Sequence, residues 1–331
     1  MDKYILTGVT GHLGGVVARL LLEQGKPVVG LYLPGEENSF PAIRSVYGNV
    51  RDKESLRGLF GSEGEAIVIH CAGHISISSF DGPDMWETNV LGTRNIVDLA
   101  LEYGVKKFVY VSSVHAIPEL PMGQTISEVS NFSADNVEGN YAKTKASATA
   151  YVMEAMKKGL PACIVHPSGI IGPYDPGQGQ MTTVLQMFLT GKLPMGVQGG
   201  YDFVDVRDAA QGILAACDKG HSGECYILSG HYYTVREFLS LASKTASKAP
   251  PRLYASAGLL RPPAVLWERL LHRLGRRTVF TPYSLYTLGT NADFSHKKAT
   301  FELGYTVRSR EETVSDMVCW TIAGLQKNSS F

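Results

Sequence analysis

The sequence predicts an α/β protein in which a doubly wound parallel sheet carries a smaller, interleaved C-terminal lobe. Two observations lead to this prediction. Short β-rich runs alternate with amphipathic helical patterns through the first half of the 331 residues, and such alternation is typical of parallel sheets covered by helices. Beyond Pro167 the alternation gives way to loops rich in glycine and proline and to isolated helical stretches.

The elements of the first half follow from apolar periodicity and from the residues that stop it. The first strand covers residues 4–7 and ends at Gly8, and the next helix repeats apolar residues at helical spacing as far as Gly25. Later strands are expected at residues 27–33, 66–71, 106–112 and 160–166. Long helices are expected at residues 86–103 and 141–157.

Composition and charge argue against several classes of protein. The hydrophobic content of 44% is that of a globular chain, and 31 basic residues balance 31 acidic ones, so no basic surplus points to nucleic acid. Five scattered cysteines indicate reduced thiols, and Met1 is followed directly by a strand pattern, so we expect a cytoplasmic protein without a signal peptide. No apolar run reaches the length of a membrane span. The histidines show no metal-ligand spacing, so no metal is expected.

A glycine-rich loop joins the first strand to the first helix. In residues 7–14 (TGVTGHLG), Gly8 permits a tight turn, Gly11 lets the backbone approach a pyrophosphate, and Gly14 lets helix and strand pack closely. The helix N-terminus offers free N–H groups and the positive end of its dipole to phosphates. The loop therefore predicts a Rossmann-like dinucleotide-binding domain.

The choice between NAD and NADP depends on the end of the second strand. An acid there holds the adenosine ribose of NAD, whereas an arginine favours the 2′-phosphate of NADP. Leu33 stands at the usual discriminating position and is neither. Glu36 or Glu37 could reach the ribose and would repel a 2′-phosphate, which favours NAD, although two solvated loop carboxylates fit the sequence equally well.

A tyrosine and a lysine share one face at the start of the helix expected at 141–157. Tyr141 and Lys145 are four residues apart, which places them side by side on a helix. The pKa of a free tyrosine is about 10, and a neighbouring ammonium together with an oxidised nicotinamide would lower it toward the range of proton exchange. Ser112 and Ser113 end the preceding strand, at the sheet edge where ligands bind. Periodicity leaves open which serine faces the site.

Together these motifs resemble the extended short-chain dehydrogenase/reductase family, the group of NAD-dependent epimerases, dehydratases and reductases. The resemblance rests on TGVTGHLG, on FVYVSS at 108–113 and on YAKTK at 141–145, and it continues through HCAG at 70–73, TNVLGT at 88–93, PSGIIGP at 167–173, DFVDVRD at 202–208 and ELGY at 302–305. It implies a catalytic set of Ser113, Tyr141, Lys145 and Asn89. Asn49 stands where the family usually has an aspartate facing the adenine.

The resemblance also implies the cofactor contacts and the division of the chain. The implied contacts with NAD or NADP are Gly8, Thr10, Gly11, His12, Leu13, Gly14, Leu33, Asn49, Val50, Cys71, Ala72, Gly73, Tyr141, Lys145, Pro167 and Ile170. Residues 1–166, with 201–229 returning to them, are expected to form the dinucleotide-binding domain. Residues 167–200 and 230–331 are expected to form the substrate-binding lobe.

Within the family, the sequence most resembles the dihydroflavonol-reductase and 3β-hydroxysteroid-dehydrogenase branches. Nucleotide-sugar epimerases carry an asparagine where this chain has Gly169, and dehydratases carry an acid after the catalytic serine where this chain has Val114 and His115. We therefore expect an oxidoreductase that interconverts a ketone or aldehyde and an alcohol on a bulky apolar substrate. The alternatives are a nucleotide-sugar epimerase or dehydratase with recycled NAD, and a non-catalytic NAD(P)-sensing protein.

The substrate side of the site is less specified by the sequence. His74, Ser113, His115 and Tyr174 flank the predicted strand ends and are candidates for the pocket, although the two histidines and Tyr174 also fit ordinary loop positions. Residues 254–274 are rich in leucine around a Pro-Pro pair. They fit a wall for a lipophilic substrate, a membrane-surface helix, or a plain amphipathic helix packed on the core.

The expected partners are a small-molecule substrate and a second copy of the chain. The helices around 87–103 and 140–157 resemble those that form a dimeric four-helix bundle in the family, which implies a homodimer. Neither nucleic acid nor a membrane-spanning segment is expected.

Overall fold

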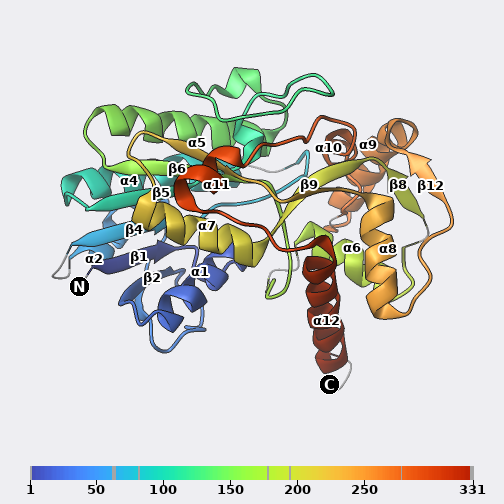
Figure 1. Cartoon of the computed structure of the whole chain (residues 1–331), viewed down its shortest axis with the longest axis horizontal. Helices are drawn as coiled ribbons and strands as arrows, with labels where there is room; N and C mark the ends of the chain where they lie inside the picture. The colour runs from blue at the N-terminus through green and yellow to red at the C-terminus, as the bar shows by residue number, and fades with distance from the viewer. Residues whose placement is uncertain are drawn as a thin grey trace.

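Seven parallel strands form the central sheet of the protein (Figure 1). The structure is a computed structural model and describes residues 2–61, 65–80, 83–176, 179–193, 195–276 and 278–328. The strand order β10-β6-β5-β4-β1-β2-β3, with every neighbouring pair parallel, confirms the predicted doubly wound α/β fold. The bounds are β1 Lys3–Thr7, β2 Val28–Tyr32, β3 Arg44–Tyr47, β4 Ala66–His70, β5 Lys107–Val111, β6 Ala162–Pro167 and β10 Cys225–Leu228.

Helices cover both faces of this sheet, which explains why its central strands are continuous apolar runs. On one face lie α1 (His12–Glu23) and α7 (Val206–Lys219), and on the other lie α4 (Gly92–Glu102) and α5 (Asn140–Lys157). Alternate residues of β1 point into the two cores. The main sheet is therefore a rigid layer whose carboxyl edge holds the loops between strands and helices.

The structure departs from the expected elements in two places. The helix expected at 86–103 begins as α3 and passes through a π-helical turn, η2, before α4, and such turns are frequent at functional sites. The strand β3 was not predicted, because its sequence RSVY is short, half-exposed and lacks an apolar run. The remaining short helices are η1 Glu54–Leu56, α2 Arg57–Phe60, α3 Pro83–Trp86, η2 Glu87–Leu91, η3 Val114–Ala116 and η4 Ala134–Asn136.

The second lobe is built on two small sheets. One has the order β11-β9-β7 and the other pairs β12 with β8. Its strands are β7 Gly169–Ile171, β8 Gly196–Gln198, β9 Gly200–Asp205, β11 His231–Thr234 and β12 Tyr254–Ser256. Its helices are α6 Gln180–Leu189, α8 Val235–Ala246, α9 Ala257–Arg273, α10 Pro282–Thr287 and α12 Arg310–Asn328, whereas α11 Lys297–Leu303 packs on α7 and β10 of the main sheet.

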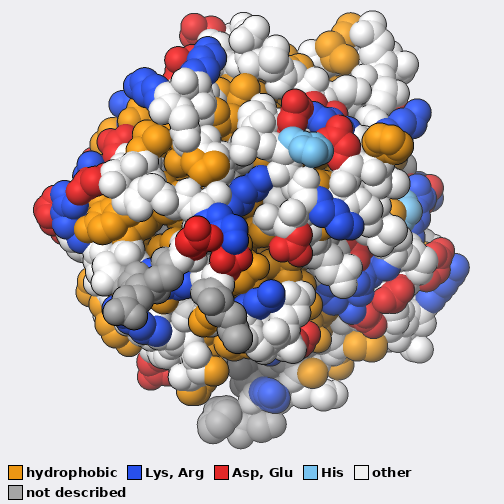
Figure 2. Space-filling view, turned by 60° about the vertical axis from the view of Figure 1, so that its left-hand side comes forward, with side chains coloured by type: hydrophobic (Ala, Val, Ile, Leu, Met, Phe, Trp, Pro, Cys, Tyr) orange, Lys and Arg blue, Asp and Glu red, His pale blue; other side chains and the backbone are white. Residues whose placement is uncertain are grey.

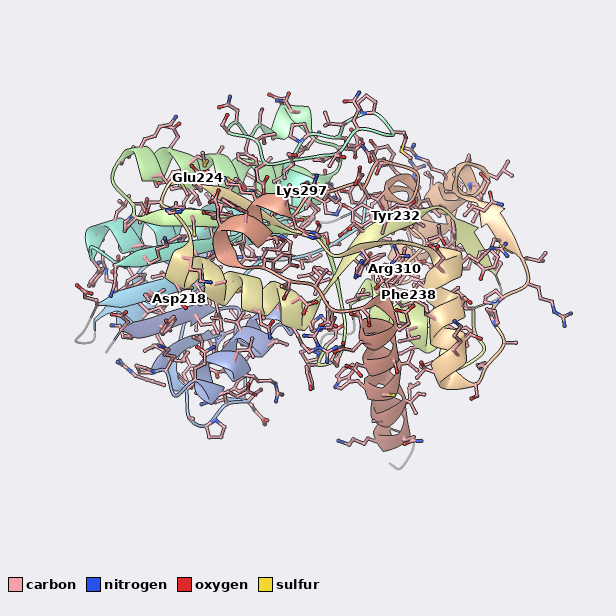
Figure 3. All side chains as sticks on the ribbon, viewed as in Figure 1. Asp218, Glu224, Tyr232, Phe238, Lys297 and Arg310 are labelled. Carbon is pink, nitrogen blue, oxygen red and sulfur yellow. The ribbon has the colours of Figure 1, made fainter. Side chains whose placement is uncertain are left out.

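A small core holds the helices of this lobe together. Phe238 of α8 packs edge-on to the Tyr233 ring, and the Arg310 guanidinium at the start of α12 lies 5.4 Å from the centroid of the same ring. Figure 3 shows Phe238 and Arg310 on neighbouring helices, far from Asp218 and Glu224 beside the main sheet. The lobe therefore has its own packed interior.

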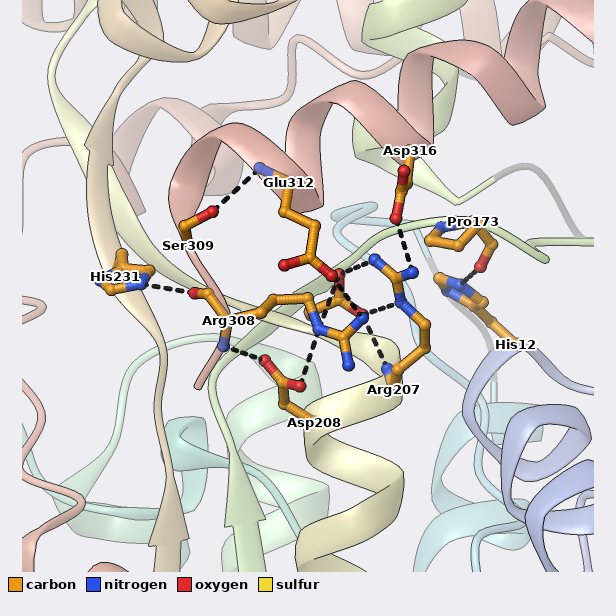
Figure 4. Close-up of polar contacts among 10 residues, drawn as sticks. His12, Pro173, Arg207, Asp208, His231, Arg308, Ser309, Glu312 and Asp316 are labelled. Atoms are coloured by element: carbon orange, nitrogen blue, oxygen red, sulfur yellow. Dashed lines mark hydrogen bonds and ion pairs between the residues drawn. The ribbon is translucent and has the colours of Figure 1, made fainter. Parts of the chain in front are cut away.

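A buried ionic network joins the two lobes where β9 runs into α7 (Figure 4). The Asp205 carboxylate accepts bonds from the Arg207 backbone and guanidinium at 2.8–2.9 Å, and Arg308 donates to Asp208 at 2.8 Å. Arg207 also reaches Asp316 of α12. Burial acts to raise the pKa of the Asp205 carboxyl, but its hydrogen bonds and the charges of Arg207 and Arg308 hold that pKa below its ordinary value. The charged carboxylate is thus part of the folded state.

The glycine loop fixes how closely α1 approaches β1. A Cβ atom on Gly14 would lie 2.0 Å from the Gly8 carbonyl oxygen, whereas a Cβ on Gly15 would meet nothing nearer than 3.5 Å. Gly8 itself has φ of 74°, and a Cβ there would lie 2.8 Å from the Ala72 backbone nitrogen. Glycine at positions 8 and 14 is therefore required by backbone contacts.

We expect Gly14→Ala to lower the free energy of unfolding, because the added methyl must push the helix away from the loop. Overpacking of this kind costs about 1–3 kcal/mol. Gly15→Ala on the same helix is the matched control and should be neutral or stabilising by about 0.5–1 kcal/mol. Denaturant unfolding of both variants measures the two free energies. Equal stabilities would contradict the packing described here.

Candidate active site

The glycine loop and the N-terminus of α1 form a cradle at the carboxyl end of β1. The N-cap residue is Gly11, and within the described turn no side chain caps the helix and no acid lies in its first turn. Its first N–H groups and the dipole of the helix therefore face outward, as a pyrophosphate requires. The Ala72 backbone, which follows β4, packs against Gly8 on one side of this cradle. This cradle fits the diphosphate of a dinucleotide.

The structure separates the two acids that follow β2. Glu36 folds back, accepting bonds from the Leu33 backbone at 2.9 Å and from the Thr10 hydroxyl at 3.3 Å. Its carboxylate therefore sits beside the glycine loop. Glu37 is exposed, so the two residues left equivalent by the sequence are not equivalent in space.

A buried chain of polar groups supports the loop after β4. The Thr7 hydroxyl lies 2.7 Å from Nδ1 of His70 and accepts from the Ala72 backbone N–H at 3.1 Å. The other ring nitrogen of His70 lies 3.1 Å from the Thr93 hydroxyl. Burial lowers the pKa of His70 to about 3, so the ring is neutral. No local sequence pattern indicates this network, because its members are far apart in the chain.

Asn89 connects the same loop to α5. It lies in the π-helical turn η2, and its side-chain oxygen accepts from the His74 backbone N–H at 2.7 Å. Its amide nitrogen donates to the His74 carbonyl and to the Thr144 hydroxyl, both at 2.9 Å. Asn89 therefore fixes the loop after Gly73 against the helix that carries Tyr141 and Lys145. His74 takes part through its backbone.

Ser113 and Tyr141 meet at the carboxyl end of β5. The Ser113 hydroxyl lies close enough to Tyr141 to act on its pKa, and the Ser113 oxygen accepts from the His115 backbone N–H at 3.2 Å. Ser112 instead faces the interior, 2.7 Å from the Thr149 hydroxyl. The strand end thus turns only one of the two serines toward Tyr141. That is the residue implied by the family resemblance.

Lys145 lies beneath this pair, one helical turn along α5. Its ammonium donates to the Val111 carbonyl at 2.9 Å and lies 5.3 Å from the centroid of the Tyr110 ring. A Cβ on Gly73 would lie 3.5 Å from the same nitrogen and 3.3 Å from the Asn89 side-chain oxygen, so Gly73 borders the lysine closely. Burial lowers the pKa of Lys145 to about 8.

Burial raises the pKa of Tyr141 to about 12, while the neighbouring Ser113 side chain acts in the opposite direction. The sequence predicts that Lys145 and an oxidised nicotinamide together lower this pKa. In the chain by itself that lowering is absent, because desolvation of the phenolate outweighs the favourable contacts. The hydroxyl therefore keeps its proton, and any lowering has to come from positive charge brought by a bound dinucleotide.

An aromatic cluster surrounds the outer side of Tyr141. The His115 ring stacks on Tyr201 with centroids 5.6 Å apart and meets the edge of Tyr141. The Tyr283 hydroxyl lies 3.2 Å from Nδ1 of His115. Burial lowers the pKa of His115 to about 4, which keeps the ring uncharged. Tyr201 and Tyr283 come from β9 and α10, so nothing near the motifs in sequence could reveal them.

A cavity of about 240 Å³ opens beside Tyr141. One wall is the loop after β4, another is the start of α5, and the third comes from α9 and α10 of the second lobe. Its lining residues are Ser76, Ile77, Ser78, Ser79, Glu138, Gly139, Asn140, Tyr141, Arg261, Pro282, Tyr283 and Tyr286. Apolar and neutral polar groups dominate this lining.

The remaining predicted site residues in this part of the molecule do not line the cavity beside Tyr141. Tyr174 has φ of 70° and packs against the Arg19 guanidinium of α1, away from the lining of the cavity. Cys71 lies below the glycine loop, and burial raises the pKa of its thiol to about 12. Among the predicted cofactor contacts, His12 and Leu13 begin α1, Asn49 and Val50 follow β3, Pro167 ends β6, and Ile170 lies in β7.

The relation of this chain to known proteins agrees with the geometry of the site. Residues 4–229 match the model of the NAD dependent epimerase/dehydratase family. The chain belongs to this family. It is therefore an NAD-dependent enzyme of the epimerase, dehydratase and oxidoreductase type, as the resemblance implied.

Similar proteins match nearly the whole chain. Sterol demethylase protein B of Methylococcus capsulatus is 30% identical over 321 residues, covering 96% of this chain and 97% of that protein. A putative dihydroflavonol 4-reductase of Synechocystis is 31% identical over 330 residues, covering 96% and 94%. The crystal structure of gox2253 is 31% identical with a TM-score of 0.85, covering 98% of this chain and 99% of that one.

Within the described ranges, no group of three or more His, Cys, Asp or Glu side chains could hold a metal ion. No described helix is both long and apolar enough to cross a bilayer.

We expect Lys145→Met to raise the free energy of unfolding at pH 7 in the absence of dinucleotide. The pKa of Lys145 falls from 10.5 to about 8 on folding, so wild-type stability rises as the pH climbs from 8 toward 10.5. The variant lacks this rise. Below pH 8 the variant should be more stable than the wild type by about 3 kcal/mol. This difference in the free energy of unfolding should shrink between pH 8 and 10.5.

Denaturant unfolding at several pH values measures this difference. Lys143→Met is the matched control, because Lys143 is exposed on the same helix and its removal should give no such trend. A stability difference between Lys145→Met and wild type that stays constant from pH 7 to 10.5 would contradict the burial of a charged lysine.

Proposed function

We propose that the protein interconverts a ketone or aldehyde and an alcohol on a bulky, apolar substrate, with Tyr141 as the general acid and base. The observation that carries this proposal is the approach of the Ser113 and Tyr141 side chains at the carboxyl end of β5, with Tyr141 in the lining of the cavity. A carbonyl oxygen seated between these two hydroxyls is held by one and protonated by the other. A bound NAD(H) supplies or accepts the hydride at the carbonyl carbon.

Each of the chain's residues has a distinct part in this step. Ser113 donates a hydrogen bond that orients the substrate oxygen and stabilises negative charge on it. Tyr141, which keeps its proton in the chain alone, donates that proton as the alkoxide forms. Lys145 holds positive charge beneath the tyrosine, and Asn89 fixes the loop that borders the lysine. In the reverse direction Tyr141 removes the alcohol proton.

The second lobe supports a reductase over a nucleotide-sugar enzyme. Gly169 occupies the position where nucleotide-sugar epimerases carry an asparagine, and a Cβ there would lie 2.6 Å from the Phe203 ring. The ring therefore fills the space that an asparagine side chain would need. After Ser113 the chain places the neutral His115 among tyrosines instead of an acid. Both features favour a planar apolar substrate.

The names of the relatives point in the same direction. One is named as a sterol demethylase protein and another as a putative dihydroflavonol 4-reductase. Sterols and flavonols are bulky ring systems that carry a ketone or an alcohol. We propose that this chain acts on a polycyclic ketone or alcohol of comparable size.

We also propose NAD as the cofactor and a homodimer as the assembly. Glu36 stands beside the glycine loop, where its charge would repel a 2′-phosphate. The dimer would pair α4 and α5 of two copies, as the family resemblance implies. Exposed Leu91 and Tyr103 flank α4 and support an apolar contact there.

Glu36→Ala should weaken NAD binding and reduce the preference for NAD over NADP, because the ribose partner and the repulsion are both lost. A change of about tenfold in the ratio of dissociation constants corresponds to about 1.4 kcal/mol. Calorimetric titration with each dinucleotide measures it. Glu37→Ala is the control, since Glu37 is exposed. Equal effects of the two substitutions would contradict the assignment.

Tyr141→Phe should lower kcat by about 10²–10⁴-fold, the usual contribution of a general acid and base, because the ring remains but the transferable proton is lost. Dinucleotide affinity should change little. Turnover is followed by nicotinamide absorbance with ketosteroids and flavanonols. Tyr151→Phe, on the same helix with its hydroxyl bonded to Asp98, is the control and should behave as wild type. Retained turnover in Tyr141→Phe would rule out the mechanism.

A further inference from the structure

The helix α9 presents an unusual distribution of side chains. Its inward face contains Ala264, Leu260 and the buried carboxylate of Glu268. Its outward face carries large apolar residues with half or more of their surface exposed: Leu259, Leu266, Trp267, Leu270 and Leu274. A helix of a globular protein normally places such residues inward. On α9 the single acid, Glu268, is buried, whereas Leu259, Leu266 and Leu270 are exposed.

The exposed charged side chains of residues 252–276 are all basic, and the acids Glu119 and Glu138 of other elements lie near Arg261 at the cavity end. Five arginines are exposed in the segment 252–276: Arg252, Arg261, Arg269, Arg273 and Arg276. The only acid in that range, Glu268, is turned inward and accepts bonds from the Ser79 backbone and hydroxyl at 2.8 and 2.9 Å. The net charge of the whole chain is zero, so this cluster of arginines is a local excess.

Another face of the molecule has a different distribution of charged side chains. In Figure 2 basic and acidic side chains are interleaved, and around α2 and η2 the arginines are paired, as Arg57 is with Glu54 and Glu102 and Arg51 is with Asp84. The arginine-rich, leucine-rich surface lies on α9 and the residues next to it, at the outer end of the second lobe in Figure 1.

We propose that α9 docks the protein on the surface of a membrane that contains anionic lipids. Leucines and a tryptophan beside arginines are the composition of helices that lie in the interface of a bilayer. The apolar side chains would enter the acyl region while the arginines bind lipid phosphates. Charge complementarity selects this occupant over a neutral apolar surface.

The position of α9 connects this surface to the cavity beside Tyr141. Arg261 lines that cavity and lies 5.2 Å from the centroid of the Tyr286 ring. The loop that forms another wall is attached to the helix through Ser79 and Glu268 and through stacking of Phe80 on His272, with centroids 4.6 Å apart. This placement indicates that the substrate is carried in the lipid phase, an inference that rests on the proposed function.

Vesicle sedimentation tests the docking without substrate or dinucleotide. Wild-type protein should bind phosphatidylcholine vesicles that contain phosphatidylserine, and bind pure phosphatidylcholine vesicles at least about tenfold more weakly. Leu266→Ser combined with Trp267→Ser and Leu270→Ser should abolish binding, since each removes exposed apolar surface. Phe301→Ser is the matched control, because Phe301 is 90% exposed on α11, and should bind as wild type.

Substitution of the arginines tests the charge requirement. Arg269→Gln with Arg273→Gln should weaken binding to the anionic vesicles by about fivefold for each arginine, whereas Lys143→Gln with Lys157→Gln, exposed on α5, should not. Thermal unfolding establishes that the variants are folded, as expected for exposed positions.

Three outcomes would overturn the proposal: no binding by the wild type, binding that survives the triple substitution, or light scattering that shows the triple substitution dissociating a dimer. The last would mean that a second copy covers α9. Because no turnover is measured, loss of this proposal leaves the oxidoreductase function standing. Failure of the Tyr141→Phe test would equally leave vesicle binding intact.

Discussion

Buried polar groups at the carboxyl edge of the main sheet are the constraint on which the site depends. Each such group must find a partner inside the protein, since an unpaired one costs about 1–3 kcal/mol. Thr7 bonds to His70 and to the Ala72 backbone, while Asn89 bonds to the His74 backbone and to Thr144 of α5. The loops around the cradle are therefore fixed by the same bonds that keep the interior satisfied.

This rigidity explains the chemical state of the site. Tyr141 and Lys145 are buried at the end of β5, where burial raises the pKa of the tyrosine to about 12 and lowers that of the lysine to about 8. The resting chain therefore contains a protonated phenol aimed at Ser113. Such a group is prepared to donate a proton, which suits reduction of a carbonyl, while alcohol oxidation needs the added positive charge of an oxidised nicotinamide.

The main sheet and the motif residues could be predicted from the sequence because they depend on local rules. Apolar runs located the buried strands, the glycine spacing located the cradle, and a four-residue spacing placed Tyr141 and Lys145 on one face. Which of Glu36 and Glu37 lies beside the glycine loop depends on how the turn after β2 folds. The partners of His115 come from β9 and α10, which are distant in sequence. Side chains brought together by tertiary packing leave no pattern in a single sequence.

The central claim is that the chain transfers hydride to an external carbonyl with net use of NADH. The most direct test uses NADH deuterated at its transferable position and a ketosteroid or flavanonol that the enzyme turns over. The account predicts one deuterium on the carbinol carbon of the product for each dinucleotide oxidised, with a single facial preference. Product formation with no net oxidation of the dinucleotide, as in an epimerase, would contradict it.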